Sequence, residues 1–461
     1  MHQDENQTGA HALLYGVEAA FIQDFQNILE GEACGKERDI LRELHAADIA
    51  DLIEQLSEND RNTLLTRLEG NINPETLSWL DEDLSVQIME NLPDTQLAKF
   101  LDHLENDDAI DVIERLDEEH QARLLRLVKS HDRAIYEATL RYPEDSAGRL
   151  MQSKVFALPS FWTVGQTIDH ARNNAEKYPD LFHNLVVVGP MHKPIGLVSL
   201  AKLLRCPRPT ALRRIMETDI KPVPADIDQE EVAALFRQYG LIEAPVVDAQ
   251  DRLVGVISVD DILSVIDEEH EEDLLSLGGI GSGGDFFSDV QETTKSRLPW
   301  LLVNLLTAVA ASLVIGFFSD TMQEIIALAV LMPIVASMGG NAGTQTLTVS
   351  VRALATNDLT FTNAGRAIVK ELLVGIANGL IFALLVGILS WVWFGDGVIG
   401  VIIAASMVIN MICAGIAGIA IPLVLVWCKR DPALASTVFL TTATDVVGFL
   451  SFLGFATLTL M

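Results

Sequence analysis

Oxygen-bearing side chains gather around a single carboxylate in the last apolar stretch of this 461-residue sequence. Asp445 is the only charged residue between 432 and 461, and Thr441, Thr442 and Thr444 lie beside it. A charge at the centre of a membrane span costs about 3 kcal/mol on insertion scales, so such a residue normally faces a protein interior or a water-filled path. These residues therefore predict a polar lining for a cation. The alternative is a structural acid that is hydrogen-bonded between helices.

A second group of small and polar residues interrupts the charge-free run 325–351. It contains a proline, three glycines and two amides: Pro333, Gly339, Gly340, Gly343, Asn341 and Gln345. The proline bends a helix, and the glycines permit close backbone approach or local unwinding. Backbone carbonyls exposed at membrane depth are tolerated only inside protein or beside a cavity. The group predicts either a pore lining or a tight helix pair of the GxxxG type.

Five long apolar runs must position these residues. They cover 298–319, 325–351, 372–395, 397–428 and 432–461. A bilayer core about 30 Å thick is crossed by about 20 apolar helical residues. The sequence therefore predicts a membrane domain of five transmembrane helices over residues 298–461.

The residues before this domain are strongly acidic. They hold 57 of the 64 acidic residues and 27 of the 32 basic ones. This balance argues against a nucleic-acid partner, because phosphates would be repelled. It also disfavours docking on anionic lipid. It favours cations as partners, or simply serves solubility.

Loop charges predict the orientation in the membrane. Lysine and arginine precede the first span and occupy the second and fourth loops, whereas the first and third loops have none. The N-terminus is polar and acidic, which is unlike a secretory signal. The positive-inside rule places residues 1–297 in the cytosol and the C-terminus outside a plasma (inner) membrane that the chain crosses several times.

Residues 38–140 predict an acidic α-helical repeat domain. "ADIADLIEQL" (47–56), "EDLSVQIMENL" (82–92) and "DDAIDVIERL" (107–116) each show apolar residues at helical spacing and acids on the other face. Stacked units of this kind bury their apolar stripes against their neighbours. Residues 1–37 form an N-terminal extension without an assignment.

Residues 141–266 show the order helix, strand, strand, helix twice. "HNLVVVG" (183–189) and "EAPVVDAQDRLVGVISVDDIL" (243–263) contain the predicted strands. The pattern resembles a tandem pair of cystathionine-β-synthase (CBS) domains. CBS pairs commonly bind adenosine nucleotides, so ATP is a candidate ligand. An acidic connecting helix and linker follow over 267–297, with Glu269, Glu272 and Asp273 on one helical face.

The combined motifs resemble the MgtE family of magnesium channels. Pro333 followed by "GGNAGTQ" (339–345) is similar to the family signature, and "TDVVG" (444–448) is similar to the acidic motif of its last span. The acidic repeats, CBS pair, connecting helix and five spans occur in the family's order. The expected fold class is therefore a multidomain α plus α/β membrane protein.

The resemblance implies a homodimer with its pore on the two-fold axis, where two Asp445 side chains meet. Carboxylates, hydroxyls and carbonyls without Cys or His suit a hydrated Mg²⁺, which prefers octahedral oxygen ligands. The family closes its pore when cytosolic Mg²⁺ bridges acidic groups. The regulatory acids carried over by resemblance are Glu75, Asp107, Asp111, Asp228, Glu230, Asp261, Glu269, Glu272 and Asp273. Gly240 and Ser264 replace two acidic positions of the family.

The resemblance thus implies a homodimeric, Mg²⁺-selective channel for Mg²⁺ uptake that cytosolic Mg²⁺ closes. Two alternatives stay open: a broader pathway for Mn²⁺ or Co²⁺, and a non-conducting membrane sensor of Mg²⁺ or nucleotide. An enzyme is not expected, because the sequence has no P-loop, GxSxG or HExxH motif.

Overall fold

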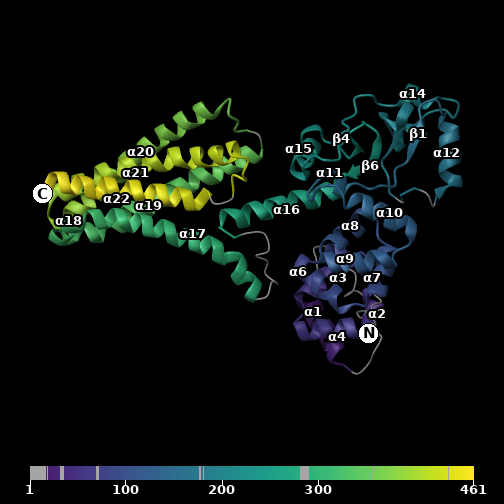
Figure 1. Ribbon diagram of the computed structural model, residues 1–461, viewed down its shortest axis with the longest axis horizontal. Helices are drawn as coiled ribbons and strands as arrows, with labels where there is room; N and C mark the ends of the chain where they lie inside the picture. Colours follow the sequence, from purple (N-terminus) through teal and green to yellow (C-terminus); the bar gives the residue numbers. More distant parts are fainter. Residues whose placement is uncertain are drawn as a thin grey trace, which may run out of the picture. The chain divides into compact units, whose positions relative to one another are not determined.

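The computed structural model describes residues 17, 19–31, 36–68, 72–175, 178–179, 181–280, 290–356, 358–433 and 436–460. It forms two compact units, Met1–Asp267 and Glu268–Met461 (Figure 1). Each unit is described by itself below. The unassigned extension 1–37 lies partly outside the described residues.

The first unit begins with a helical domain. Its helices are α1 (Ala19–Glu30), α2 (Lys36–Leu41), α3 (Ala46–Gln55), α4 (Glu58–Leu68), α5 (Thr76–Trp79), α6 (Glu82–Asn91), α7 (Asp94–Leu101), α8 (Asn106–Glu114), α9 (Glu118–Leu127) and α10 (Ser130–Thr139). Aspartates begin two of them, since Asp81 accepts from the backbone N–H of Leu84 and Asp117 from that of His120. Leu52 and Leu84 lie in one shared core, and Phe25 of α1 joins it. The predicted helical domain is confirmed, and α1 adds to it a helix from the extension.

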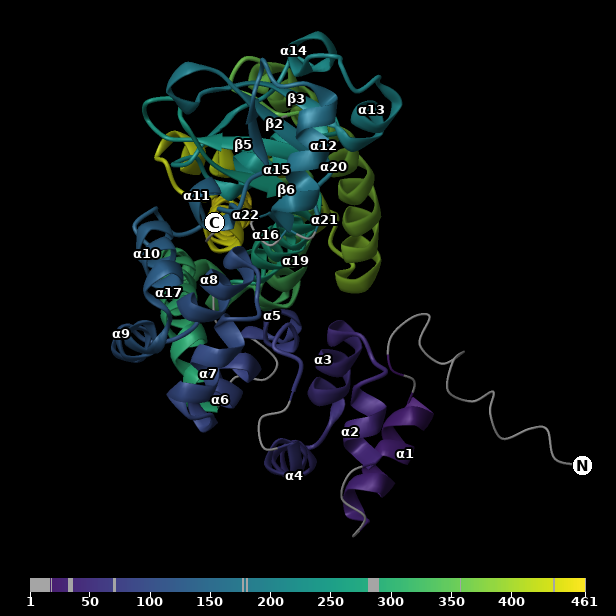
Figure 2. The ribbon, with the colours of Figure 1, turned by 90° about the vertical axis from the view of Figure 1, so that its right-hand side faces the viewer.

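Two α/β modules follow in the same unit. The first contains β1 (Ala157–Pro159), α12 (Val164–Asn173), β2 (Asn184–Val188), the 3-10 turn η2 (Pro190–His192), β3 (Pro194–Ser199), α13 (Leu200–Arg205) and α14 (Leu212–Ile215). The second contains β4 (Val223–Pro224), α15 (Gln229–Tyr239), β5 (Glu243–Val247), β6 (Leu253–Ser258) and α16 (Val259–Leu277), and α11 (Ala147–Leu150) packs in its core. Strands of both modules are labelled in Figure 2.

The two modules share one strand arrangement. Each is a three-stranded sheet with one parallel and one antiparallel pair, in the order β1-β2-β3 and β4-β5-β6. Asn184 pairs with Ser199 in the first, as Glu243 pairs with Ser258 in the second. This internal repetition confirms the predicted CBS pair.

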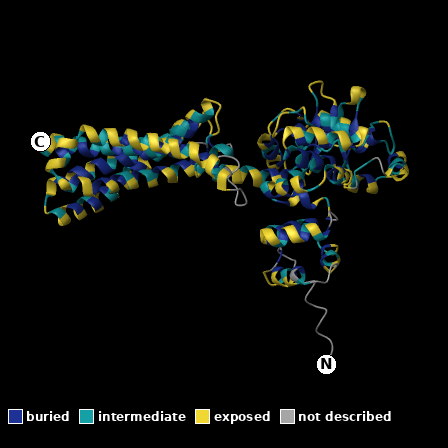
Figure 3. Cartoon of the chain, turned by 60° about the horizontal axis from the view of Figure 1, so that its bottom comes forward, coloured by how far each residue is buried: buried dark blue, intermediate teal, exposed yellow. Residues whose placement is uncertain are grey.

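The second unit is helical. It contains α17 (Val290–Phe317), α18 (Ser319–Glu324), α19 (Ile326–Ala355), α20 (Ala364–Phe394), α21 (Gly397–Trp427) and α22 (Ser436–Leu460), and it also includes the end of α16. Five of these helices are long and apolar enough to cross a membrane, namely all except α16 and α18. Figure 3 shows exposed residues along their outer faces, and Leu305, Leu384 and Val401 are among the apolar ones. Exposed apolar side chains on long helices suit contact with lipid.

Candidate ion path and acidic cluster

Asp445 lies near the middle of α22 and is half-buried. It makes no hydrogen bond or ion pair with the described residues of the chain. Its threonine neighbours bond within their own helix: Thr441 donates to the carbonyl of Thr437 at 3.0 Å, and Thr444 to that of Leu440 at 3.1 Å. Their oxygens therefore keep lone pairs for another ligand, although Thr444 is fully buried and Thr441 is not.

The glycine-rich motif lies on α19, which runs unbroken through Pro333. Local unwinding, one of the two expectations, is therefore not seen. Close approach is seen instead, because a Cβ added at Gly339 would lie 2.2 Å from Asn410 Nδ2 and one at Gly343 would lie 2.8 Å from Leu440. A Cβ at Gly340 would meet nothing within 4 Å.

The polar residues of the motif point elsewhere. Asn341 and Gln345 are both exposed in the single chain, and their spacing places them on one face of the unbroken helix. The helix thus has a packing face with Gly339 and Gly343, and an open polar face with the two amides. The pore lining and the tight helix pair are compatible on this helix, because they use different faces.

Two polar residues of the spans were missed by the sequence analysis. Glu371 lies inside α20, and Thr346 of α19 donates to its Oε2 at 3.1 Å. The apolar run 372–395 begins one residue later, so the sequence pattern predicts no carboxylate in this span. Asn410 of α21 is fully buried and lies against Gly339. Its signal in the sequence was an amide at the centre of an otherwise apolar span.

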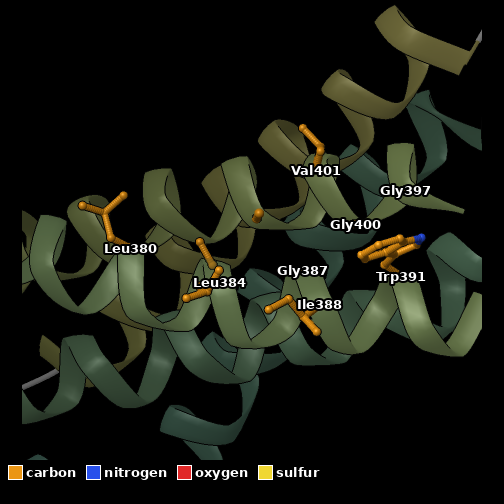
Figure 4. A pocket seen from close by; sticks show the side chains of 10 residues that line it. Leu380, Leu384, Gly387, Ile388, Trp391, Gly397, Gly400 and Val401 are labelled. Carbon is orange, nitrogen blue, oxygen red and sulfur yellow. The ribbon is translucent and has the colours of Figure 1, made fainter.

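An apolar pocket lies between α20 and α21, outside this group (Figure 4). Leu384, Ile388, Trp391 and Val401 line it, with other apolar side chains and glycines. It offers no carboxylate or amide to a cation. The pocket is therefore not part of the candidate ion path.

An acidic cluster forms in the first unit between the start of α8 and the start of α16. We give this name to Glu105, Asp107, Asp108, Asp111 and Asp261. Burial and then the charge of Asp108 raise the pKa of Asp107 to about 7. Burial, and to a smaller extent the charge of Asp107, raises the pKa of Asp261 to about 7. Burial, and to a smaller extent the charge of Asp111, raises the pKa of Asp108 to about 6. Carboxylates that disfavour one another's charge in this way are stabilised by a cation.

The carboxylates of the acidic cluster lie near one another, but their spacing does not form a metal site. Among the described residues, no three Asp, Glu, His or Cys side chains are near enough to hold a metal ion as they stand. Asp107 Oδ1 is buried without a hydrogen-bond partner in that same set, so this oxygen keeps its lone pairs unused. Asp111 is already paired, since its Oδ2 lies 2.8 Å from Arg115 Nη2. Asp108 was not predicted from the sequence.

The other predicted acids of the first unit lie at different helix starts. Glu75 is the exposed residue before α5. Asp228 caps α15 by accepting from the backbone N–H of Glu230 at 2.9 Å, and both side chains are exposed. Gly240 ends the same helix in the left-handed conformation, with φ of 61°. The structure thus joins Asp107, Asp111 and Asp261 in one cluster, and places Glu75, Asp228 and Glu230 at the starts of other helices.

The acidic end of α16 packs within the second unit. Thr437, in the first turn of α22, donates to the carbonyl of Leu277 at 2.9 Å. Burial and then Asp431 and Glu269 raise the pKa of Asp273. Asp431 was not predicted as a partner of this group. The connecting helix, which also carries Glu272, therefore contacts the same helix that carries Asp445.

This architecture defines a multi-pass membrane protein with an acidic helical domain, a CBS pair and an intramembrane carboxylate. Family models agree along the chain: a divalent cation transporter model matches residues 332–455, the MgtE intracellular N domain matches 44–145, and a CBS domain matches 212–268. The chain belongs to the MgtE family.

Relatives of similar length support this membership. The magnesium transporter MgtE of Thermus thermophilus is 33% identical over 429 residues, covering 92% of this chain and 95% of that protein. The magnesium transporter MgtE of Bacillus subtilis is 29% identical over 420 residues, covering 91% and 93%. Among solved structures, the cytosolic domain of the Mg²⁺ channel MgtE in complex with ATP is 32% identical, with a TM-score of 0.49, and covers 53% of this chain and 99% of that one.

Proposed function

We propose that this protein is a homodimeric channel that carries Mg²⁺ into the cell. The observation that carries the proposal is Asp445, a carboxylate in the last span without a partner among the described residues of its own chain. An intramembrane charge is costly unless it faces protein, water or an ion. A structural acid between helices needs a hydrogen bond that this chain does not supply within its described part.

The chemistry of the surrounding groups favours Mg²⁺. Asp445 and Thr441 on α22 offer a carboxylate and a hydroxyl, and the exposed side chains of Asn341 and Gln345 on α19 offer amide oxygens. Mg²⁺ gives up its waters reluctantly, and a largely hydrated ion is well held by carboxylates acting through those waters. A second copy across a two-fold axis brings a second Asp445 to the path. The names of the relatives, magnesium transporters, support this ion.

We further propose that cytosolic Mg²⁺ closes the channel. Without Mg²⁺ the carboxylates of the acidic cluster repel one another, and this repulsion pushes α8 and α16 apart. Bound Mg²⁺ neutralises the cluster and favours the compact arrangement, to the extent that it binds this state more tightly. The contact between Thr437 and Leu277 supports a route from α16 to α22.

Orientation and nucleotide binding complete the proposal. Lysine and arginine in the loops support a cytosolic first unit and an outside C-terminus in the plasma (inner) membrane. ATP is the candidate ligand of the CBS pair. Equilibrium dialysis of the full-length protein against ATP tests this part separately, and no binding at physiological nucleotide concentration removes it.

Growth in low Mg²⁺ tests the transport proposal. Cells without their own Mg²⁺ transporters express wild type, Asp445→Ala or Asp396→Asn. Asp396 caps α21 outside the apolar run and serves as the matched acid. We expect wild type and Asp396→Asn to restore growth and Asp445→Ala to fail at equal expression. Equal growth with Asp445→Ala contradicts the role of this carboxylate, and no growth with wild type favours the sensor alternative.

A further inference from the structure

Asn410 is a fully buried amide on α21, with a relative exposure of 0%. Its Nδ2 donates a hydrogen bond to the backbone carbonyl of Val335, on α19, at 2.8 Å. Val335 follows Pro333 by two residues. The amide therefore binds α19 in the turn that contains its proline.

Two glycines from the two membrane motifs lie against the same amide. A Cβ added at Gly339 would lie 2.2 Å from Asn410 Nδ2, and one added at Gly448 would lie 2.9 Å from it. Gly339 begins "GGNAGTQ" on α19, and Gly448 ends "TDVVG" on α22. Asn410 thus lies where α19, α21 and α22 meet, between the motifs that carry the proposed ion-path residues.

Chemistry fixes the orientation of the amide. Only its NH₂ group can donate to the Val335 carbonyl, so Oδ1 must point the other way. Oδ1 is buried and accepts no hydrogen bond from the described residues. A buried acceptor without a donor costs free energy, and a leucine, which has the same heavy-atom branching but no acceptor, would not incur this cost beside Val335. Stability of the helix bundle therefore does not explain why an amide occupies this position.

We propose that Asn410 is a positioning residue of the ion path. Its amide fixes the spacing of α19 and α22, and with it the distance between the Asn341 and Gln345 face and Asp445. The inference rests on the proposed transport function. A hydrated Mg²⁺ is held through its waters, so a small change in this spacing alters both the rate of passage and the preference among divalent ions.

Reconstituted full-length protein tests this role with a shape-matched variant. Asn410→Leu keeps the number and branching of the side-chain heavy atoms and removes the donor. Ser406→Ala is the control, because Ser406 is equally buried on the same helix but its hydroxyl donates to its own helix, at the Ile402 carbonyl. Uptake of Mg²⁺ and of Co²⁺ is measured, together with the melting temperature in detergent. We expect Asn410→Leu to melt as wild type does, to take up Mg²⁺ about tenfold more slowly and to change the Mg²⁺ to Co²⁺ ratio.

A steric role is separated by a compensating pair. Gly339→Ala alone pushes its methyl group into the amide and is expected to reduce uptake. Asn410→Ala combined with Gly339→Ala relieves that contact but leaves the donor missing, so uptake stays at the level of Asn410→Ala alone. The positioning role is overturned if the double variant takes up Mg²⁺ as fast as wild type. It is also overturned if Asn410→Leu has the uptake rate and the Mg²⁺ to Co²⁺ ratio of wild type. Neither result affects the proposal that wild type transports Mg²⁺. Absence of uptake by wild type overturns the proposed function itself.

Discussion

Replacing Asp107 by asparagine is expected to stabilise the Mg²⁺-free protein and to weaken its response to Mg²⁺. Burial and then Asp108 raise the pKa of this carboxyl from 3.8 to about 7. One pKa unit corresponds to about 1.4 kcal/mol, so ionised Asp107 lowers the free energy of unfolding by up to about 4 kcal/mol. Asp261 shares this repulsion, so the two contributions do not add.

The sign of the pH dependence follows from the raised pKa values. The folded protein binds more protons than the unfolded chain between about pH 4 and pH 7, so stability falls as the pH rises through this window. Mg²⁺ binds ionised carboxylates, so it restores stability above this window and binds more weakly as the pH falls. Asparagine does not ionise, and Asp107→Asn removes a large part of both effects.

Thermal unfolding of the full-length protein in detergent measures the effect of pH and of Mg²⁺ on stability, from about pH 5 to pH 8, with and without saturating Mg²⁺. We expect Asp107→Asn to raise the melting temperature of Mg²⁺-free protein at neutral pH, at about 2–4 °C per kcal/mol. Asp226→Asn is the control, because Asp226 is an exposed aspartate of the same unit whose charge is not among the causes that raise the pKa values of the cluster. A lower melting temperature in Asp107→Asn, or an unchanged shift with Mg²⁺, refutes this account of the acidic cluster.

Further substitutions test the packing of the ion-path helices and the connecting helix. Gly343→Ala is expected to lower the free energy of unfolding by about 1–3 kcal/mol, because its methyl group would lie 2.8 Å from Leu440. Gly340→Ala is the control and is expected to be tolerated, because a Cβ there meets nothing within 4 Å. Melting temperatures in detergent compare the two variants, and equal values contradict the assigned faces. Thr437→Val removes the hydrogen bond to the Leu277 carbonyl and is expected to raise the Mg²⁺ concentration needed to close the channel. Patch-clamp recording with Mg²⁺ varied on the cytosolic side measures this, and closure at the wild-type concentration contradicts a route through this contact.

Much of the fold follows from patterns that are local in the sequence. Apolar runs long enough for a bilayer predicted the five spans, and the repeated helix–strand–strand–helix order predicted the paired sheets. An apolar run belongs to a single helix and the repeated order to a single module, so neither pattern depends on contacts between distant residues. The helix through Pro333 was harder to judge, because only neighbouring helices determine whether glycines unwind or pack.

The remaining features of the candidate sites depend on contacts between distant residues. Asn410 and Val335 are 75 residues apart, and neither spacing nor composition relates them. Asp108 is as acidic in sequence as its neighbours, and only its burial beside Asp111 and Asp261 sets it apart. Glu371 was missed because α20 extends beyond the charge-free run.

Mg²⁺ flux into proteoliposomes tests the central claim most directly. Purified wild type and Asp445→Asn are reconstituted at equal density, with a Mg²⁺-sensitive dye inside and Mg²⁺ added outside. The isosteric amide removes the charge and keeps the shape of the side chain. We predict rapid Mg²⁺ entry with wild type and entry near the protein-free rate with Asp445→Asn. Equal entry through both proteins, or none through wild type, contradicts a Mg²⁺ path that depends on Asp445.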